Sequence, residues 1–275
     1  NSLSGTCMKV IEKRTGKLYI FYIYDELSEE KYLIKMFLQD FDVLSHLNHP
    51  AILKYTKFHY PIFNRDHSSQ LPQQNTPTST NNLTNPISLN RFITASKYPL
   101  NGTVFSALKE YLDSNGQKNQ RMNPTIRSKI IFGVAAAMKF MHEHCIINRN
   151  LSLKNIFLDE NFEPKIANYG FHFYRDSNLS LYQKDPYDLF FLAPEEFYDD
   201  QFDQNYDCNI DVYSFAFVIY MMFSQNVEFP QKIRSPMSLM LKVARGLRPF
   251  KPKLMPDCYW KLVCHCWDQD ILVRP

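Results

Sequence analysis

An apolar run near the start of the sequence has the composition of a β-strand. Residues 17–24 (Lys-Leu-Tyr-Ile-Phe-Tyr-Ile-Tyr) are rich in aromatic and β-branched side chains, which favours a strand. The Arg14-Thr15-Gly16 segment before them is typical of a tight turn. We therefore expect a hairpin in which this strand pairs with residues 7–11.

A helical period follows this hairpin. Ser28 can cap a helix that has Lys31 just inside it. Five apolar residues then recur at three- and four-residue steps: Leu33, Phe37, Phe41, Leu44 and Leu47. Residues 64–90 lose all periodicity and are rich in Ser, Thr, Asn, Gln and Pro, which predicts a long, mobile, disordered surface insertion. A short strand is expected over residues 91–96.

The remainder is predicted to be mainly helical. Thr103 can cap a helix that stops at Gly116, and Pro124, just after Asn123, opens a longer helix that runs through His144. The middle of that helix, residues 130–138, is apolar nearly all round, which predicts a buried central helix.

A second strongly apolar helix is predicted over residues 211–223. The pattern as a whole predicts an α+β fold, with a small β-rich part that carries one main helix and a larger, mostly helical part.

Composition narrows the class of protein. The 275 residues are 45% hydrophobic and 21% charged with a net charge of +3, which is typical of a globular domain and argues against nucleic acid as a partner. We expect no membrane insertion, because no apolar run approaches the roughly 20 residues of a membrane span.

The six cysteines are scattered, which favours reduced thiols and a cytoplasmic location over disulfides. Cys264-His265-Cys266 has no second ligand pair at zinc spacing, so a metal site there is disfavoured.

Five motifs, in order along the chain, resemble those of protein kinases. The first is similar to the catalytic loop His-Arg-Asp-Leu-x-x-x-Asn with its apolar strand, and the others to Asp-Phe-Gly, Ala-Pro-Glu, the start of the buried helix and the Cys-Trp…Arg-Pro ending. In this sequence they are residues 146–158, 165–170, 192–195, 211–216, and Cys266-Trp267 with Arg274-Pro275. The last motif, with residues 246–249, points to the tyrosine-kinase-like group.

The resemblance implies a bilobal protein-kinase-like fold over the whole chain. The expected small lobe is residues 1–96, including the insertion 64–90. Residues 97–101 would be the hinge, and residues 102–275 the large, mostly α-helical lobe.

The same resemblance implies that the catalytic chemistry is damaged. Kinases use an Asp to take the substrate proton, and a second Asp with an Asn to hold Mg²⁺. Here the first Asp is replaced by Asn150 and the second by Asn168, and neither amide carries a titratable carboxylate. Two further positions of the loop also differ from the pattern, Asn148 and Ser152, whereas two match it, Arg149 and Asn155. We expect no catalytic residue to be functional and no metal to be held.

The small lobe is altered as well. Tyr22 falls at the lysine that clamps the nucleotide phosphates, and Asp40 falls at its glutamate partner. Bulky side chains stand where the adenine pocket is normally slender, so we expect a partly filled pocket and no cofactor. The positions of this degenerate ATP pocket are Gly5, Cys7, Ile20, Ser96, Tyr98 and Phe157.

Other positions match the family in structural roles. Glu195 and Arg274 resemble its buried ion pair, and Asp211 resembles the carboxylate that holds the catalytic loop. Three hydroxyl residues of the activation segment are candidate phosphorylation sites, although ordinary exposed hydroxyls are the simpler reading. They are Ser177, Ser180 and Tyr182, and a phosphate there would pair with Arg149 and Lys165.

The expected function is that of a pseudokinase, a catalytically inactive domain that serves as a protein-interaction or regulatory scaffold. Its partners would be other proteins, such as an active kinase or a signalling complex. Two alternatives stay open: a weakly active ATP-dependent serine/threonine or tyrosine kinase with a relocated lysine (Lys9, Lys17 or Lys35), and a nucleotide-binding switch without transfer. ATP and Mg²⁺ belong only to these alternatives.

Overall fold

The computed structural model describes residues 6–23, 31–59, 93–113, 122–170, 187–197, 207–224 and 235–275. Several predicted features lie outside these residues: Gly5, the helix cap Ser28, the insertion 64–90, and the hydroxyl residues Ser177, Ser180 and Tyr182.

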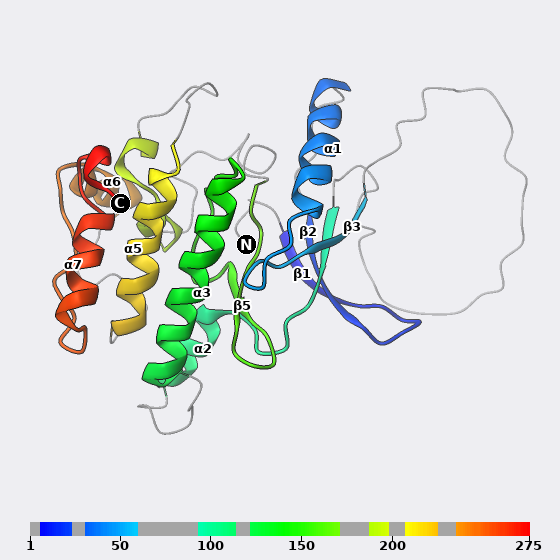
Figure 1. Ribbon diagram of the computed structural model, residues 1–275, viewed down its shortest axis with the longest axis horizontal. Coiled ribbons are helices and arrows are strands. Elements are labelled where there is room, and N and C mark those ends of the chain that lie inside the picture. The colour runs from blue at the N-terminus through cyan, green and yellow to red at the C-terminus, as the bar shows by residue number, and fades with distance from the viewer. Residues whose placement is uncertain are drawn as a thin grey trace, which may run out of the picture.

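One end of the molecule is a four-stranded antiparallel sheet (Figure 1). Its strands are β1 (Thr6–Ile11), β2 (Leu18–Ile23), β3 (Tyr55–His59) and β4 (Ile93–Lys97), in the order β1-β2-β4-β3. The predicted hairpin is confirmed, because β1 pairs with β2 across a turn in which Gly16 adopts a φ of 68°. That left-handed conformation suits glycine, which has no Cβ to clash with the main chain.

Helix α1 (Lys31–Ser45) packs its apolar stripe toward the sheet. Phe37, Phe41 and Leu44 are buried, as their spacing predicts, and Leu47 is buried just beyond the helix. The polar residue Asp42 on the opposite face is exposed, so the helix is amphipathic.

The larger part of the molecule is helical (Figure 1). Helix α2 (Val104–Asp113) begins after Thr103, whose Oγ1 accepts the Ser106 N–H at 3.1 Å. Helix α3 (Pro124–Glu143) begins after Asn123, whose Oδ1 accepts the Ile126 N–H at 2.9 Å. The predicted cap at Thr103 and the predicted start of α3 are confirmed, and each cap satisfies an N–H group that has no partner within the helix.

The central buried helix is α5 (Asn209–Phe223), not α3. Every residue of α5 from Tyr213 to Met222 is buried, because α3, helix α7 (Asp257–Cys266) and the short turn η3 (Asp188–Phe191) all pack against it. The prediction that residues 130–138 are buried all round was wrong, since Phe132 of α3 is 77% exposed. Helix α3 has one face open to solvent.

Shorter elements complete the large lobe: the hairpin strands β5 (Ile156–Leu158) and β6 (Pro164–Ile166), helix α6 (Pro236–Ala244), and the 3₁₀ helices η4 (Pro194–Phe197) and η5 (Ile271–Val273). The predicted α+β, bilobal kinase-like fold is confirmed. Among the described residues, no helix combines the length and apolar character needed to cross a membrane.

Main-chain hydrogen bonds join the two lobes beside the candidate site. Leu53 N–H donates to the Ile166 carbonyl at 2.8 Å, and Ile166 N–H donates to the Ala51 carbonyl at 2.8 Å. These bonds fix the stretch before β3 against β6. The loop before β5 and the segment after β6 are therefore held at the junction of the lobes.

Candidate functional site

A buried carboxylate holds the loop of residues 148–155. Asp211 in α5 is fully buried and accepts the Asn148 N–H at 2.7 Å and the Arg149 N–H at 2.8 Å. His142 Nε2 of α3 lies 2.9 Å from the same carboxylate. Hydrogen bonds to an ionised acceptor are the stronger kind, so Asp211 fixes the start of the loop on the two large-lobe helices.

Asn150 stands at the position of the kinase proton acceptor, and its side chain is used inside the protein. Its Nδ2 donates to the main-chain carbonyl of Asn168 at 2.8 Å. The amide therefore ties the loop to the segment after β6. An Asp carboxylate has no proton to donate in this way, so the bond is one that only the amide, or a protonated acid, can make.

Three other polar side chains of the loop form hydrogen bonds within it. The Asn148 side chain is buried, and its Oδ1 accepts the Asn150 N–H at 2.9 Å. Asn155 Nδ2 donates to the Asn150 carbonyl at 2.9 Å and to Ser152 Oγ at 3.3 Å. Four of the predicted positions (Asn148, Asn150, Ser152 and Asn155) thus lie together in one network.

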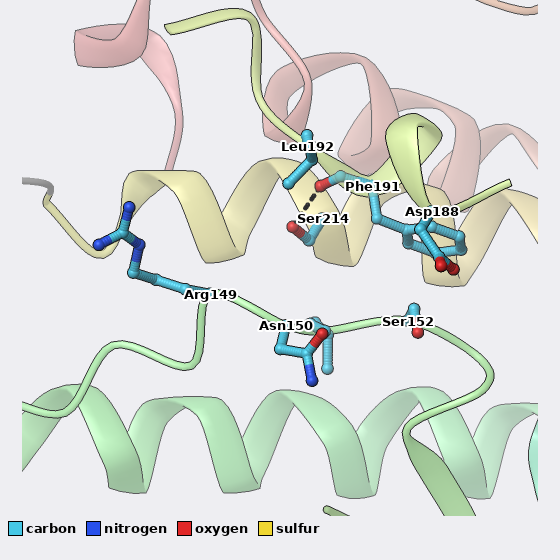
Figure 2. A pocket seen from close by; sticks show the side chains of 8 residues that line it. Arg149, Asn150, Ser152, Asp188, Phe191, Leu192 and Ser214 are labelled. Carbon is cyan, nitrogen blue, oxygen red and sulfur yellow. Dashed lines mark hydrogen bonds between the residues drawn. The ribbon is translucent and has the colours of Figure 1, made fainter. Parts of the chain in front are cut away.

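A small pocket lies beside this loop, on the side of α5 (Figure 2). It is lined by Arg149, Asn150, Leu151, Ser152, Asp188, Phe191, Leu192 and Ser214. In Figure 2 the Arg149 side chain leaves the loop in a different direction from Asn150, and Asp188 lies at the other end of the pocket. The Ser214 hydroxyl donates to the Phe191 carbonyl, which fixes η3 on α5.

Lys154 is a feature of the loop that the sequence reading missed. Its Nζ lies 3.1 Å from Asp188 Oδ1 and 4.6 Å from the centroid of the Tyr187 ring. Tyr187 in turn packs edge-on against Phe105 of α2, with ring centroids 5.0 Å apart. The ammonium group of Lys154 is therefore engaged with the end of the activation segment.

The predicted nucleotide-site positions in the small lobe and on β5 hold buried side chains. Ile20 and Ser96 are 1% exposed, Tyr22 is 4% exposed and Phe157 is 5% exposed. Asp40 lies half-buried on α1. Cys7 pairs with Tyr22 in the β1–β2 ladder.

Three side chains from β1, the predicted hinge and β5 contact one another in series. Lys9 Nζ of β1 lies 4.5 Å from the centroid of the Tyr98 ring, a cation–π contact. Tyr98 lies edge-on to Phe157 of β5, with ring centroids 6.3 Å apart. All three candidates for a relocated lysine, Lys9, Lys17 and Lys35, are exposed, and Lys9 also lies over an aromatic ring.

The two residues predicted to brace the large lobe form a bidentate ion pair. Arg274 Nη1 and Nη2 donate to Glu195 Oε1 at 2.6 Å and Oε2 at 3.1 Å. The Arg274 side chain is fully buried and also donates to the main-chain carbonyls of Asn209 and Asp268. Lys165, by contrast, is bonded to Asp159 at 3.2 Å and to the Pro50 carbonyl.

Comparison with known proteins decides the family. Residues 89–275 match the model of the protein tyrosine and serine/threonine kinase family. The chain belongs to this kinase family.

The curated relatives include proteins named as kinases and one named as a probable inactive kinase. A probable inactive serine/threonine-protein kinase of Dictyostelium discoideum is 30% identical over 156 residues, which is 54% of this chain and 7% of that protein. A probable serine/threonine-protein kinase of the same organism is 29% identical over 189 residues, 68% of this chain and 14% of that protein. The human dual serine/threonine and tyrosine protein kinase is 30% identical over 152 residues, 54% of this chain and 16% of that protein. The chain therefore spans only a small part of each relative's length.

Membership of the kinase family implies Mg²⁺, and the residues present do not fit it. Asn168 has a φ of 55°, and its buried Oδ1 accepts no hydrogen bond from the described residues. Together with Asn155 it would offer two neutral amide oxygens, whereas Mg²⁺ is normally held through carboxylates. No cluster of three His, Cys, Asp or Glu side chains suited to a metal occurs in the described part of the chain.

The implied nucleotide fits no better. A heteroaromatic ring in the cleft would take polar contacts from free main-chain groups of the hinge. Tyr98 N–H donates to Leu18, Asn101 N–H to Leu158 and Gly102 N–H to Pro99, so these donors are used within the chain. Pro99 has no N–H at all. The sequence reading missed Pro99, although a proline inside the predicted hinge was visible.

Proposed function

We propose that this chain is a catalytically inactive kinase domain that acts through contacts with other proteins. The observation that carries the proposal is the hydrogen bond from Asn150 Nδ2 to the Asn168 carbonyl. It joins Asn150, at the position of the proton acceptor, to Asn168, at the position of the metal-binding Asp, and both side chains are amides. An amide cannot accept the substrate proton, and loss of general-base catalysis alone typically lowers rates by about 10²–10⁴.

The cationic side chains near the cleft support the same proposal. Tyr22, at the position of the phosphate lysine, is neutral and buried in the small-lobe core. Lys9 lies on the Tyr98 ring and Lys154 on Asp188. Phosphoryl transfer relies on positioned cations that neutralise phosphate charge, so a chain with these arrangements is poorly built for it.

The proposed working surface is on the large lobe, around the end of the activation segment. The Glu195–Arg274 pair and the Lys154–Asp188 contact fix residues 187–197 on the helices beneath them. A surface held in this way needs little ordering when a partner binds, which favours affinity. A protein partner, such as an active kinase or a signalling complex, is part of the proposal.

Nucleotide binding is the first test. The expected result is no rise in melting temperature when ATP is added at millimolar concentration, with or without Mg²⁺. An active member of the family is run alongside as a positive control. A Mg²⁺-dependent rise would favour the nucleotide-binding switch, because a ligand that binds the folded state must stabilise it.

Transfer of labelled phosphate from ATP is the second test, and a paired revertant sharpens it. We expect neither the natural chain nor Asn150→Asp/Asn168→Asp to label itself or a general acceptor protein. The double variant restores both carboxylates but leaves the phosphate lysine absent and the pocket filled. Labelling by the natural chain would overturn the proposal, and labelling by the double variant alone would show that only the two amides prevent catalysis.

A further inference from the structure

Two buried tyrosines join the lobes beside the candidate site. The ring centroids of Tyr55 in β3 and Tyr169 after β6 lie 4.8 Å apart. The Tyr55 hydroxyl donates to the Tyr169 carbonyl at 2.9 Å, and the Tyr169 hydroxyl donates to the Leu53 carbonyl at 3.1 Å. Each hydroxyl thus bonds to the main chain of the opposite segment. We call Tyr55, Tyr169 and these two hydrogen bonds the tyrosine clasp.

Because the clasp is buried, we expect its two hydrogen bonds to open together and not one at a time. Tyr55 is 2% exposed and Tyr169 is 0% exposed, so neither hydroxyl can exchange its acceptor for water while the site stays closed. A buried polar group without a partner is costly. Moving Tyr169 out of its place therefore breaks both hydrogen bonds and uncovers both rings in one step.

The residues on either side of Tyr169 are also held. Gly170 has a φ of 78°, and a Cβ built there would lie 2.6 Å from Leu44 Cδ1, so α1 packs directly on the main chain. Asn168 adopts a φ of 55°, a region that Asn tolerates better than most residues, and its carbonyl is bonded to Asn150. Residues 168–170 are thus fixed by α1, by β3 and by the catalytic loop.

We infer that the tyrosine clasp locks residues 168–170 between the two lobes without any bound ligand. A switch needs two arrangements of similar free energy. Moving this segment breaks hydrogen bonds to β3, the stretch before it and the catalytic loop, and also its packing against α1. The chain then presents the surface around its site in one constant arrangement. This inference concerns conformation, so it can fail or hold independently of whether the chain transfers phosphate.

Hydrogen exchange read by mass spectrometry tests the clasp. Tyr55→Phe and Tyr169→Phe keep the rings and remove one hydroxyl each. Amides in residues 53–55 and 168–170 should exchange about two- to tenfold faster in each variant, the factor expected for the loss of one buried hydrogen bond. The double variant should show the product of the two factors. In the natural chain, addition of ATP and Mg²⁺ should leave the protection of these amides unchanged.

Tyr220→Phe is the matched control, because Tyr220 is a buried tyrosine of α5 that lies outside the clasp. It should leave exchange of residues 168–170 unchanged. Three results would each overturn the inference: exchange of these amides in the natural chain at the rate of unstructured peptide, protection that develops only with ATP and Mg²⁺, or equal acceleration by Tyr220→Phe and the clasp variants. If either clasp variant fails to fold, the other still decides the question.

Discussion

Two sets of polar side chains in the large lobe differ in whether they carry a charge. In the first, Asp211 and Arg274 are buried ionisable groups with several hydrogen-bond partners, and the partly buried Glu195 pairs with Arg274. In the second, the catalytic loop and the segment after β6 place neutral amides, Asn150 and Asn168, where the family pattern has carboxylates.

The difference teaches which charges this fold depends on. Removing one partner from a buried ion pair leaves an unpaired charge in a poorly solvated place. Replacing a catalytic carboxylate by an amide removes a charge that faces the substrate side, and here the amide gains an internal hydrogen bond. The fold can therefore keep its buried charges while positions 150 and 168 are neutral.

The largest expected effect comes from breaking the ion pair. Arg274→Met should lower the free energy of unfolding by about 3–5 kcal/mol, because Glu195 and two carbonyls lose their donor. Chemical denaturation measures the change. As a control, Lys139→Met removes an exposed pair with Glu143 on α3 and should cost under about 0.5 kcal/mol. Equal losses in the two variants would remove the distinction between buried and exposed charge.

Asp211→Asn should have the next largest effect. The amide keeps one acceptor oxygen, but its Nδ2 then faces a main-chain N–H that needs an acceptor. We expect a loss of about 2–3 kcal/mol, again by denaturation, because the broken bond is charge-assisted. The exposed Asp257→Asn serves as the comparison, and a loss there as large as at Asp211 would argue against the anchoring role.

Asn150→Asp tests the effect of a charge at the candidate site. A carboxylate oxygen would face the Asn168 carbonyl, and the variant should lose about 1–3 kcal/mol of stability near pH 7. The loss should shrink as the pH falls and the acid regains a proton to donate. Asn123→Asp is the matched control, since at this helix cap the side-chain oxygen is the acting atom and Asp caps as well as Asn. A revertant as stable as the natural chain at all pH values would contradict the structural role of Asn150.

The smallest expected effect is a pH dependence at the junction of the lobes. Burial, and to a lesser extent the charge of Lys165, lowers the pKa of His49 below its usual 6.5. The unfolded chain then binds a proton more readily than the folded one, so this contribution to stability is present above about pH 6.5 and is lost as the pH falls toward the folded-state pKa. The His49 Nδ1 also accepts the Ala51 N–H at 3.1 Å, which a protonated ring cannot do. His49→Asn should flatten the pH profile of unfolding between about pH 5 and 7, and an unchanged slope would rule out this origin.

Much of the fold was predictable because local chemistry sets it. Aromatic and β-branched composition predicted β2, a helical period predicted α1, and the helices after Thr103 and Asn123 start where expected. The burial of α3 was not predictable from its own residues, because an apolar run does not say which neighbours cover it. Phe132 is exposed for that reason, whereas α5 is enclosed.

Sequence alone determined the family resemblance and the residue types at positions 150, 168 and 22, because these depend only on residue identity. Tertiary structure alone decided what the replacements do. Asn150 bonds to Asn168, Lys9 lies on Tyr98, and Tyr55 and Tyr169 bond across more than 100 positions of sequence. Hydrogen bonds and ring contacts act over a few ångströms, and only folding brings residues so distant in sequence within that range.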